Sequence, residues 1–186
     1  MKDKIKDAFL EILETTPIEK IKVKDIAEKC HISRQTFYYH YYDIFSILKY
    51  IFEKQTEKAL EDVTFVEDLE TSYLKIMNWF KKNERLITIT YNYDNGRLLK
   101  NCLKQILLPT INKLVEKNSY GYSVTNKQLS FISNFYFITL ISFLFDWIED
   151  GMFISPNVLI KNANLIIQNN FEDTLRNFEL YNDNNS

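Results

Sequence analysis

Glycine, proline, cysteine and histidine are all scarce in this 186-residue sequence. Glycine and proline occur three times each, too seldom for the many tight turns of a β-sandwich or barrel, so long helices are expected instead. The two cysteines, Cys30 and Cys102, form no CxxC pair, and the two histidines, His31 and His40, lie on different predicted elements. This pattern excludes a disulfide framework and argues against a metal site.

Catalytic and targeting motifs are missing as well. The sequence has no nucleophile-base-acid set, no glycine-rich phosphate loop and no metal-ligand spacing, so we expect no enzyme, no cofactor and no metal. Charged side chains interrupt the first residues, which speaks against a secretory signal and favours a cytoplasmic protein. The uncharged stretch 128–145 reaches the lower end of the roughly 17–25 residues that cross a bilayer. It contains polar residues such as Ser133 and Asn134, and we expect no membrane insertion.

Apolar residues recur at helical spacing along most of the chain, which predicts an all-α fold with about nine helices. Local signals set several helix ends: Ser33 is placed to accept a hydrogen bond from the amide of Thr36, and Asp43 caps the next helix. Ser155-Pro156 is a helix start signal. Residues 17–21 are expected to form an extended connection that buries Ile18 and Ile21. The predicted helices span residues 3–14, 23–30, 33–40, 44–60, 66–82, 84–93, 97–118, 126–150 and 156–178.

The stretch from Lys22 to Leu48 predicts a helix-turn-helix, with the turn at His31-Ile32. Residues 20–42 carry five basic and two acidic side chains, a local charge of +3 in a chain whose net charge is −2. Such a basic patch on an acidic protein favours a partner bound at one end, such as nucleic acid.

The second helix of this motif carries side chains suited to reading DNA. Arg34 can donate two hydrogen bonds to guanine, Gln35 can pair with adenine, and the Thr36 methyl group can contact thymine. A bland alternative for the tyrosines is surface or packing aromatics. The other polar side chains of the stretch suit phosphate contacts: Lys22, Lys24, Tyr38, Tyr39 and His40.

The segment IKVKDIAEKCHISRQTFYYHYYDIFSIL closely resembles the helix-turn-helix of TetR/AcrR-type transcriptional regulators. The shared features are the V-x-D-I-A opening, the I-S turn, the polar pair before Thr36, the aromatic run that follows and the acidic cap at Asp43. With the first helix, the resemblance covers residues 3 to about 50. A weaker match is WIEDGM at 147–152.

The resemblance implies a DNA-binding domain at 1–48, with a recognition helix at about 33–40, and a larger C-terminal helical domain at 49–186 for effector sensing and dimerisation. It implies a homodimer on double-stranded DNA with a near-palindromic operator. It places base contacts on Lys24, Arg34, Gln35 and Tyr38, and phosphate contacts on Lys22, Ser33, Thr36, Tyr39 and His40. Two positions depart from the usual pattern: Lys22 replaces a capping threonine, and Ile44 replaces a lysine.

The C-terminal part is unusually apolar. Residues 129–148 have apolar stripes on two faces, and the following predicted helix has one as well. Helices too apolar for a monomer surface predict a homodimer through about 126–178, formed as a four-helix bundle. An aromatic effector pocket is a further hypothesis, with ordinary core packing as the alternative; its candidate residues are Trp79, Tyr91, Phe135, Phe143 and Trp147.

The hypothesis that follows is a transcriptional repressor that an unknown small-molecule or protein effector releases from a palindromic operator. Two alternatives stay open: an activator of the same fold controlled by a protein co-regulator, and a helical interaction module without DNA binding.

Overall fold

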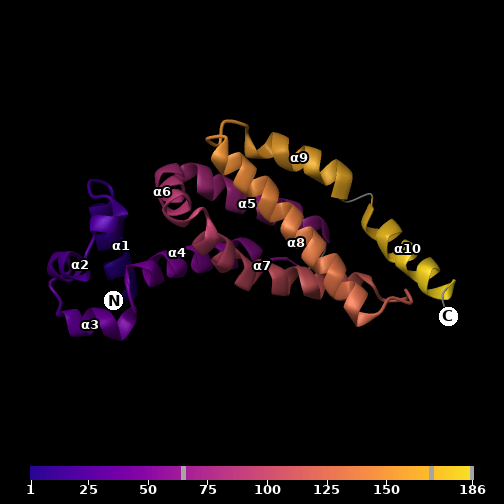
Figure 1. The fold of residues 1–186 in the computed structure, drawn as a ribbon, viewed down its shortest axis with the longest axis horizontal. Coiled ribbons are helices and arrows are strands. Elements are labelled where there is room, and N and C mark those ends of the chain that lie inside the picture. The colour runs from indigo at the N-terminus through magenta and orange to yellow at the C-terminus, as the bar shows by residue number, and fades with distance from the viewer. Residues whose placement is uncertain (64–65, 168–169, 185–186) are drawn as a thin grey trace. The chain divides into compact units, whose positions relative to one another are not determined.

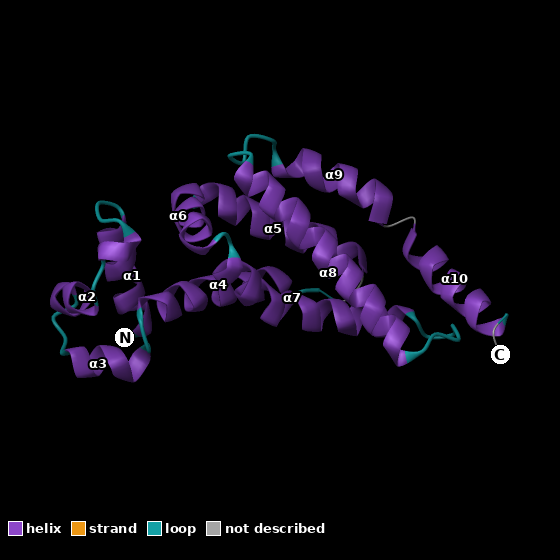
Figure 2. Cartoon of the chain, in the orientation of Figure 1, coloured by secondary structure: helices purple, strands orange, loops and turns teal. Residues whose placement is uncertain are grey.

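The computed structural model describes residues 1–63, 66–167 and 170–184, and this part of the chain is helical with connecting turns and loops (Figure 1; Figure 2). Two compact units divide the chain, Met1–Lys54 and Gln55–Ser186. The division falls inside α4 (Ile44–Leu60), as does the border predicted between residues 48 and 49. That predicted border stays a prediction.

The first unit is built around the fully buried Phe9, Ile26, Phe37 and Leu48, one from each of its four helices. Each helix thus turns its apolar side towards a common core. The unit's elements are α1 (Lys2–Leu13), the 3-10 turn η1 (Ile18–Lys20), α2 (Val23–Lys29), α3 (Arg34–His40) and the first part of α4.

The connection between α1 and α2 differs from the predicted extended segment. Ile18 and Ile21 are buried as expected, but residues Ile18–Lys20 form a turn of 3-10 helix. The amide of Lys20 donates to the carbonyl of Pro17 at 2.9 Å, and the amide of Ile21 donates to Ile18 at 3.2 Å. These local bonds satisfy backbone groups that an extended segment would leave to water.

The second unit consists of longer helices. α7 packs along α8, α6 packs on α7, and α9 packs on α5 (Figure 1). Between α6 and α7 the chain reverses at Asn95 and Gly96, which both have positive φ values, 53° and 73°. The helices are α5 (Val66–Lys82), α6 (Glu84–Asp94), α7 (Arg97–Asn118), α8 (Asn126–Glu149), α9 (Pro156–Ile167) and α10 (Phe171–Asp183).

The prediction of one helix over 156–178 is wrong, because two helices, α9 and α10, occupy this region. Residues 168 and 169 of the predicted helix lie outside the described residues. At Asn170 the side-chain amide donates to the carbonyl of Ile166 at 2.6 Å. That carbonyl is the acceptor that the Asn170 backbone amide would use in a continuous helix. The same contact from Asn134 to Ser130 lies inside the continuous α8, so it does not by itself end a helix.

Candidate nucleic-acid interface and a ligand cavity

Local hydrogen bonds shape the turn between α2 and α3. The Asp25 carboxylate accepts from the amide of Lys22 at 3.0 Å and so caps the start of α2, although the lysine side chain has no acceptor of its own. His31 adopts a left-handed conformation with φ 53°, and the amide of Ile32 donates to the carbonyl of Ala27 at 2.9 Å. This is the reversal that commonly ends a helix. The chain therefore leaves α2 sharply and enters α3 within a few residues.

The start of α3 is capped as the sequence predicts. Ser33 Oγ accepts from the amide of Thr36 at 3.0 Å, and the two hydroxyl groups lie 2.9 Å apart. Phe37, with 0% exposure, anchors the helix in the core. Because this anchor fixes one face of α3 inward, the residues on either side of it must point outward.

The predicted contact residues lie together on and beside α3. Arg34, Gln35 and Ser33 are exposed, and Tyr39 is exposed to 86%. The half-buried members are Thr36 and His40, whose ring packs edge-on against Tyr39. The remaining predicted residues, Lys22, Lys24 and Tyr38, are exposed.

Lys24 lies 3.5 Å from Glu28, one turn further along α2. This exposed pair costs little to separate, so Lys24 can turn to another anion. Tyr42, which directly follows α3 and is as exposed as Tyr39, was not among the predicted contacts. Its signal in the sequence is its place in the aromatic run, but helical periodicity cannot orient a residue beyond the helix end.

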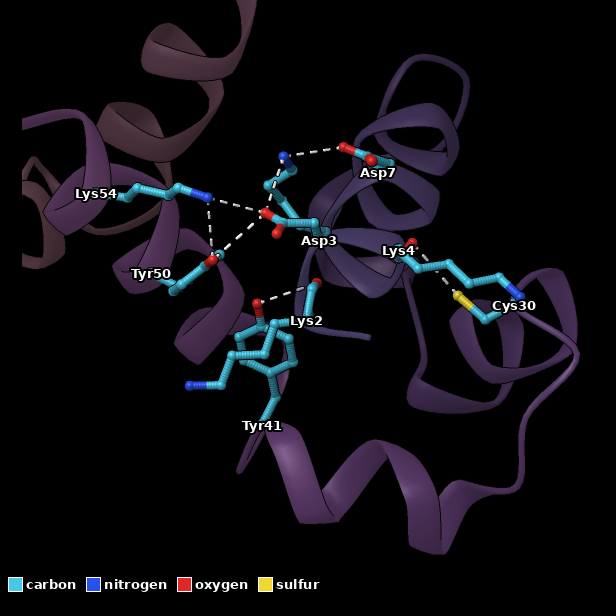
Figure 3. A network of polar contacts seen from close by, with 9 residues as sticks. Lys2, Asp3, Lys4, Asp7, Cys30, Tyr41, Tyr50 and Lys54 are labelled. Carbon is cyan, nitrogen blue, oxygen red and sulfur yellow. Dashed lines mark hydrogen bonds and ion pairs between the residues drawn. The ribbon is translucent and has the colours of Figure 1, made fainter. Parts of the chain in front are cut away.

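A network of polar contacts ties α3 and α4 to the N-terminal helix (Figure 3). The Tyr41 hydroxyl donates to the carbonyl of Lys2 at 3.3 Å. The Asp3 carboxylate accepts from Tyr50 at 3.3 Å and from Lys54 at 3.2 Å. Burial raises the pKa of Tyr41, whereas the hydrogen bond from Lys54 lowers the pKa of Asp3. The network holds the end of α3 against α1 without using any predicted contact residue.

At the start of α4, Asp43 and Ser46 cap each other. Ser46 donates its amide to Asp43 Oδ1 at 2.7 Å, and the amide of Asp43 donates to Ser46 Oγ at 3.2 Å. The predicted cap at Asp43 is confirmed. Together with the network of Figure 3, this cap holds the exposed helix α3 against α1 and α4. A short exposed helix held in this way is typical of a recognition helix that enters the major groove.

The second unit contains a cavity between α5, α7, α8, α9 and α10, with Leu60 of α4 also in its wall. Its volume is about 70 Å³, room for several waters. The lining is almost wholly apolar. It consists of Leu60, Leu69, Tyr73, Leu107, Ile111, Leu114, Val115, Tyr136, Leu140, Ile160, Ala163 and Phe171, with Glu70, Thr110 and Asn164 as further polar members.

None of the five aromatic residues predicted for an effector pocket lines this cavity. Trp147 is buried and donates its indole N–H to the carbonyl of Ile154 at 2.7 Å. Tyr91 packs edge-on against Phe145 and donates to Glu149. Trp79 is half-buried, whereas Phe135 and Phe143 are exposed. Sequence reasoning missed Glu70 and Asn164, because their pairing depends on two helices that are distant in the sequence.

α8 and α9 expose a large apolar face. On α8 one side is buried, while Phe135 is exposed to 58% on the other. Such a face is too apolar for an ordinary monomer surface. By length and composition alone, α8 is also a candidate membrane span, with 39% of its most apolar window buried. Among the described side chains of the two helices, the large exposed apolar ones are Phe131, Phe135, Ile138, Phe143, Val158, Leu165 and Ile166.

Groups of histidine, cysteine and acidic residues that could hold a metal ion are absent from the described part of the chain. Both cysteines are buried as free thiols. Burial raises the pKa of Cys30, and its Sγ lies 3.6 Å from the carbonyl of Lys4 (Figure 3). A thiol of this kind packs as a small apolar side chain.

Curated relatives of this chain are transcriptional regulators. It is 41% identical over 61 residues to the HTH-type transcriptional regulator YxbF of Bacillus subtilis, a match that covers 31% of this chain and 16% of that protein. It is 24% identical over 128 residues to DhaS, the transcriptional activator of the dhaKLM operon of Lactococcus lactis, covering 67% of each protein.

Solved structures share the fold. The dihydroxyacetone kinase operon activator DhaS superposes with a TM-score of 0.67 at 19% identity, over 96% of this chain and 97% of that one. The repressor FadR of Thermus thermophilus, in complex with lauroyl-CoA, superposes with a TM-score of 0.56 at 13% identity, over 87% and 90% of the two chains. At these identities the likeness shows the fold alone.

The family model described as "Transcriptional regulator C-terminal region", of the TetR type, matches residues 67–169. This match covers more than half of the chain and lies outside the helix-turn-helix, so it is independent of the resemblance in the first 50 residues. The N-terminal motif and the C-terminal helices thus point to the same family. The chain belongs to the TetR family of DNA-binding transcriptional regulators.

Proposed function

We propose that this protein is a homodimeric repressor that binds a near-palindromic operator and leaves it when an effector occupies the C-terminal unit. The observation that carries the proposal is the first turn of α3, where Arg34 and Gln35 are exposed while Phe37 holds the helix in the core. Guanidinium and amide groups at the start of an inserted helix suit direct base readout.

The contact roles follow the resemblance to TetR/AcrR-type regulators, and most of these residues are exposed on or beside α3. Base contacts are proposed for Lys24, Arg34, Gln35 and Tyr38. Phosphate contacts are proposed for the hydroxyl, imidazole and ammonium groups of Lys22, Ser33, Thr36, Tyr39 and His40. Ser33 Oγ accepts from the amide of Thr36, and its hydroxyl can donate to a phosphate when Thr36 Oγ1 is the donor of their shared hydrogen bond. Lys22 adds a cation at a helix start, whereas Ile44 removes a phosphate contact that relatives of the family have.

A salt titration of DNA binding tests this reading. The probe is a duplex selected by the protein itself from a random-sequence library. Neutralising phosphates demands a steep fall of log K with log salt, and Lys22→Ala should reduce that slope by about 1. Arg34→Ala should cost roughly 1–3 kcal/mol and relax the preference at one base pair. Lys100→Ala, an exposed lysine of the second unit, is the control; a slope near zero for the unmodified protein contradicts the proposal.

Dimerisation is proposed through the exposed apolar face of α8 and α9. A two-fold dimer would place two recognition helices about 34–36 Å apart, one turn of B-DNA, or a multiple of that. Sedimentation equilibrium at micromolar concentration should give twice the chain mass, 22.3 kDa. Phe135→Glu should shift the equilibrium towards monomer, because it introduces a charge into the apolar contact; a monomeric unmodified protein contradicts the proposal. We place this dimer in the cytoplasm, where its operator DNA is.

Activation is the second candidate function. It is supported by the likeness to DhaS, an activator, in both sequence and fold. In that case a protein co-regulator would take the place of a small effector. A reporter driven by the selected operator separates the two: a repressor lowers expression when the protein is added, whereas an activator raises it.

A further inference from the structure

The cavity of the second unit has one charged side chain in an otherwise apolar wall. Glu70 of α5 is half-buried there, and Asn164 of α9 donates its side-chain amide to Glu70 Oε2. Among the described residues no hydrogen bond to Glu70 Oε1 is found, and no ion pair to this carboxylate. Asn164 therefore orients the carboxylate and occupies one of its two oxygens.

The other polar groups of the wall are engaged within the protein. Tyr73 donates its hydroxyl to the carbonyl of Leu140, and Thr110 donates to the carbonyl of Ile106 at 3.1 Å. Tyr136 is hydrogen-bonded with Thr174. Each of these three hydroxyls thus has a hydrogen-bond partner within the protein. Glu70 is the group best able to receive a donor from a bound molecule.

The charge of the wall selects the head group. Lysine, arginine and histidine are absent from the described residues that line the cavity. An anionic head would lie beside the Glu70 carboxylate and be repelled by its charge, whereas a cation would be attracted. FadR of Thermus thermophilus binds lauroyl-CoA, a molecule with an anionic end that this wall does not accommodate.

We infer that the cavity binds a cationic amphiphile, with an apolar body among the leucines and a protonated amine that donates to Glu70. The apolar surface supplies the affinity, at about 0.8 kcal/mol per buried CH₂ group. The single carboxylate supplies the selectivity, because a site with one oriented polar group discriminates by head-group chemistry. The cationic amphiphile would be the effector of the proposed repressor. Its binding in the cavity does not depend on the proposed function, whereas its effect on DNA binding does.

The test uses three probes with the same ten-carbon chain and different heads: decylamine, decanol and decanoate. Isothermal titration calorimetry on the full chain should rank decylamine tightest, with decanoate weaker by at least about tenfold. Glu70→Gln should weaken decylamine by about tenfold and leave decanol within about threefold. Glu116→Gln, an exposed carboxylate on α7, is the matched control and should change none of the three affinities.

A second variant tests the location. Ala163→Leu adds volume to the cavity wall and should weaken all three probes alike. Thermal unfolding of each variant checks that it is folded. If Ala163→Leu does not fold, the comparison with Glu70→Gln still tests the inference. The inference is overturned if decanoate or lauroyl-CoA binds as tightly as decylamine. It is also overturned if Glu70→Gln leaves the affinity for decylamine unchanged, or if none of the three probes binds.

DNA binding is measured separately, on the selected duplex, with and without decylamine. Release of the duplex by decylamine supports its role as effector. Decylamine binding that leaves DNA affinity unchanged overturns the effector role and leaves the ligand class supported. A ligand-free protein that does not bind the duplex contradicts the proposed function, whereas the calorimetry still decides the ligand class.

Discussion

At the scale of single residues, Gly96 is the glycine of the three at which an added side chain meets the closest contacts. Its φ is 73°, and a Cβ atom there would lie 2.5 Å from Tyr91 and 2.9 Å from Phe145. The Tyr91 ring cannot swing aside freely, because its hydroxyl donates to Glu149 of α8. The turn between α6 and α7 therefore requires glycine.

Gly96→Ala should destabilise the protein by roughly 2–4 kcal/mol, from backbone strain together with overpacking. Urea unfolding followed by circular dichroism measures the change. Gly121→Ala is the matched control, because Gly121 also has a positive φ but has no atom within 4 Å of its added Cβ. It should cost only about 1–2 kcal/mol, and equal costs at the two positions would show that the rings give way.

Tyr91 makes stability depend on alkaline pH. Burial, and then the hydrogen bond and charge of Glu149, raise the pKa of Tyr91 to about 12, whereas an unfolded tyrosine titrates near 10. A raised pKa contributes stability that is present below about pH 10 and is lost as the pH rises towards 12.

The urea midpoint of the unmodified protein should therefore decrease as the pH is raised from 9 to 11.5. The midpoint of Tyr91→Phe should decrease less steeply over the same range. Other tyrosines contribute equally to both proteins, so the difference isolates Tyr91. Tyr120→Phe, at an exposed position, should follow the unmodified protein. If the urea midpoints of all three proteins fall with pH at the same rate, Tyr91 does not cause the loss of stability.

At the scale of elements, α10 is held at both ends. Phe171 at its start lies in the cavity wall and packs against Tyr136 of α8. Near its end, Glu179 accepts from the amide of Ser123 at 2.9 Å, and Gln128 donates to Asn182 at 2.8 Å. These polar contacts join α10 to the loop before α8 and to the first turn of α8, so α10 is an integral part of the second unit.

Leu175→Ala tests whether α10 is docked in solution. Leu175 has 0% exposure, and truncating a leucine in a packed site typically costs about 2–5 kcal/mol. Leu180→Ala on the same helix is the control, because Leu180 is 53% exposed and should cost well under 1 kcal/mol. Thermal unfolding of the two variants compares them, and equal small losses would mean that α10 is detached.

Sequence predicted the elements best where a local signal sets the end of a helix. The caps at Ser33 and Asp43 are made by short polar side chains that accept from a backbone amide three residues on, so they can be seen in the sequence. The division between α9 and α10 was missed, because the apolar stripe runs on across it and no local signal in the sequence marks it.

Of the candidate sites, the exposure of the predicted contact residues on α3 was predictable from the sequence, whereas the cavity was not; the DNA contacts themselves stay a prediction. A helix-turn-helix is local, and the buried Phe37 fixes which face of α3 points inward. The cavity is lined by residues of six helices, and its character comes from one carboxylate, Glu70. Aromatic residues such as Phe135 were poor guides, because an apolar stripe cannot reveal which of its faces is covered.

At the scale of the whole molecule, α4 continues across the division between the two units. Its first turn is held by Asp43 and Ser46, and its last residue, Leu60, lies in the cavity wall. In the proposed function, a ligand that displaces Leu60 acts on the same helix that begins in the first unit. We propose α4 as the route from the effector to the DNA contacts.

Glu57→Gly combined with Lys58→Gly should uncouple the two events. Both residues are exposed, and each glycine costs the helix about 1 kcal/mol. Decylamine should still bind, but it should no longer change the affinity for the selected duplex. The double alanine variant at the same positions is the control and should keep the coupling; full coupling in the glycine variant contradicts a mechanical role for α4.

The exposed apolar face of α8 and α9 has a consequence for gene dosage. If two chains must meet on this face before both half-sites are read, operator occupancy at low concentration rises with the square of the number of chains. A twofold change in synthesis then gives close to a fourfold change in occupancy. A regulator built this way responds to its own abundance as a threshold, and Phe135→Glu would raise that threshold without touching a single DNA contact.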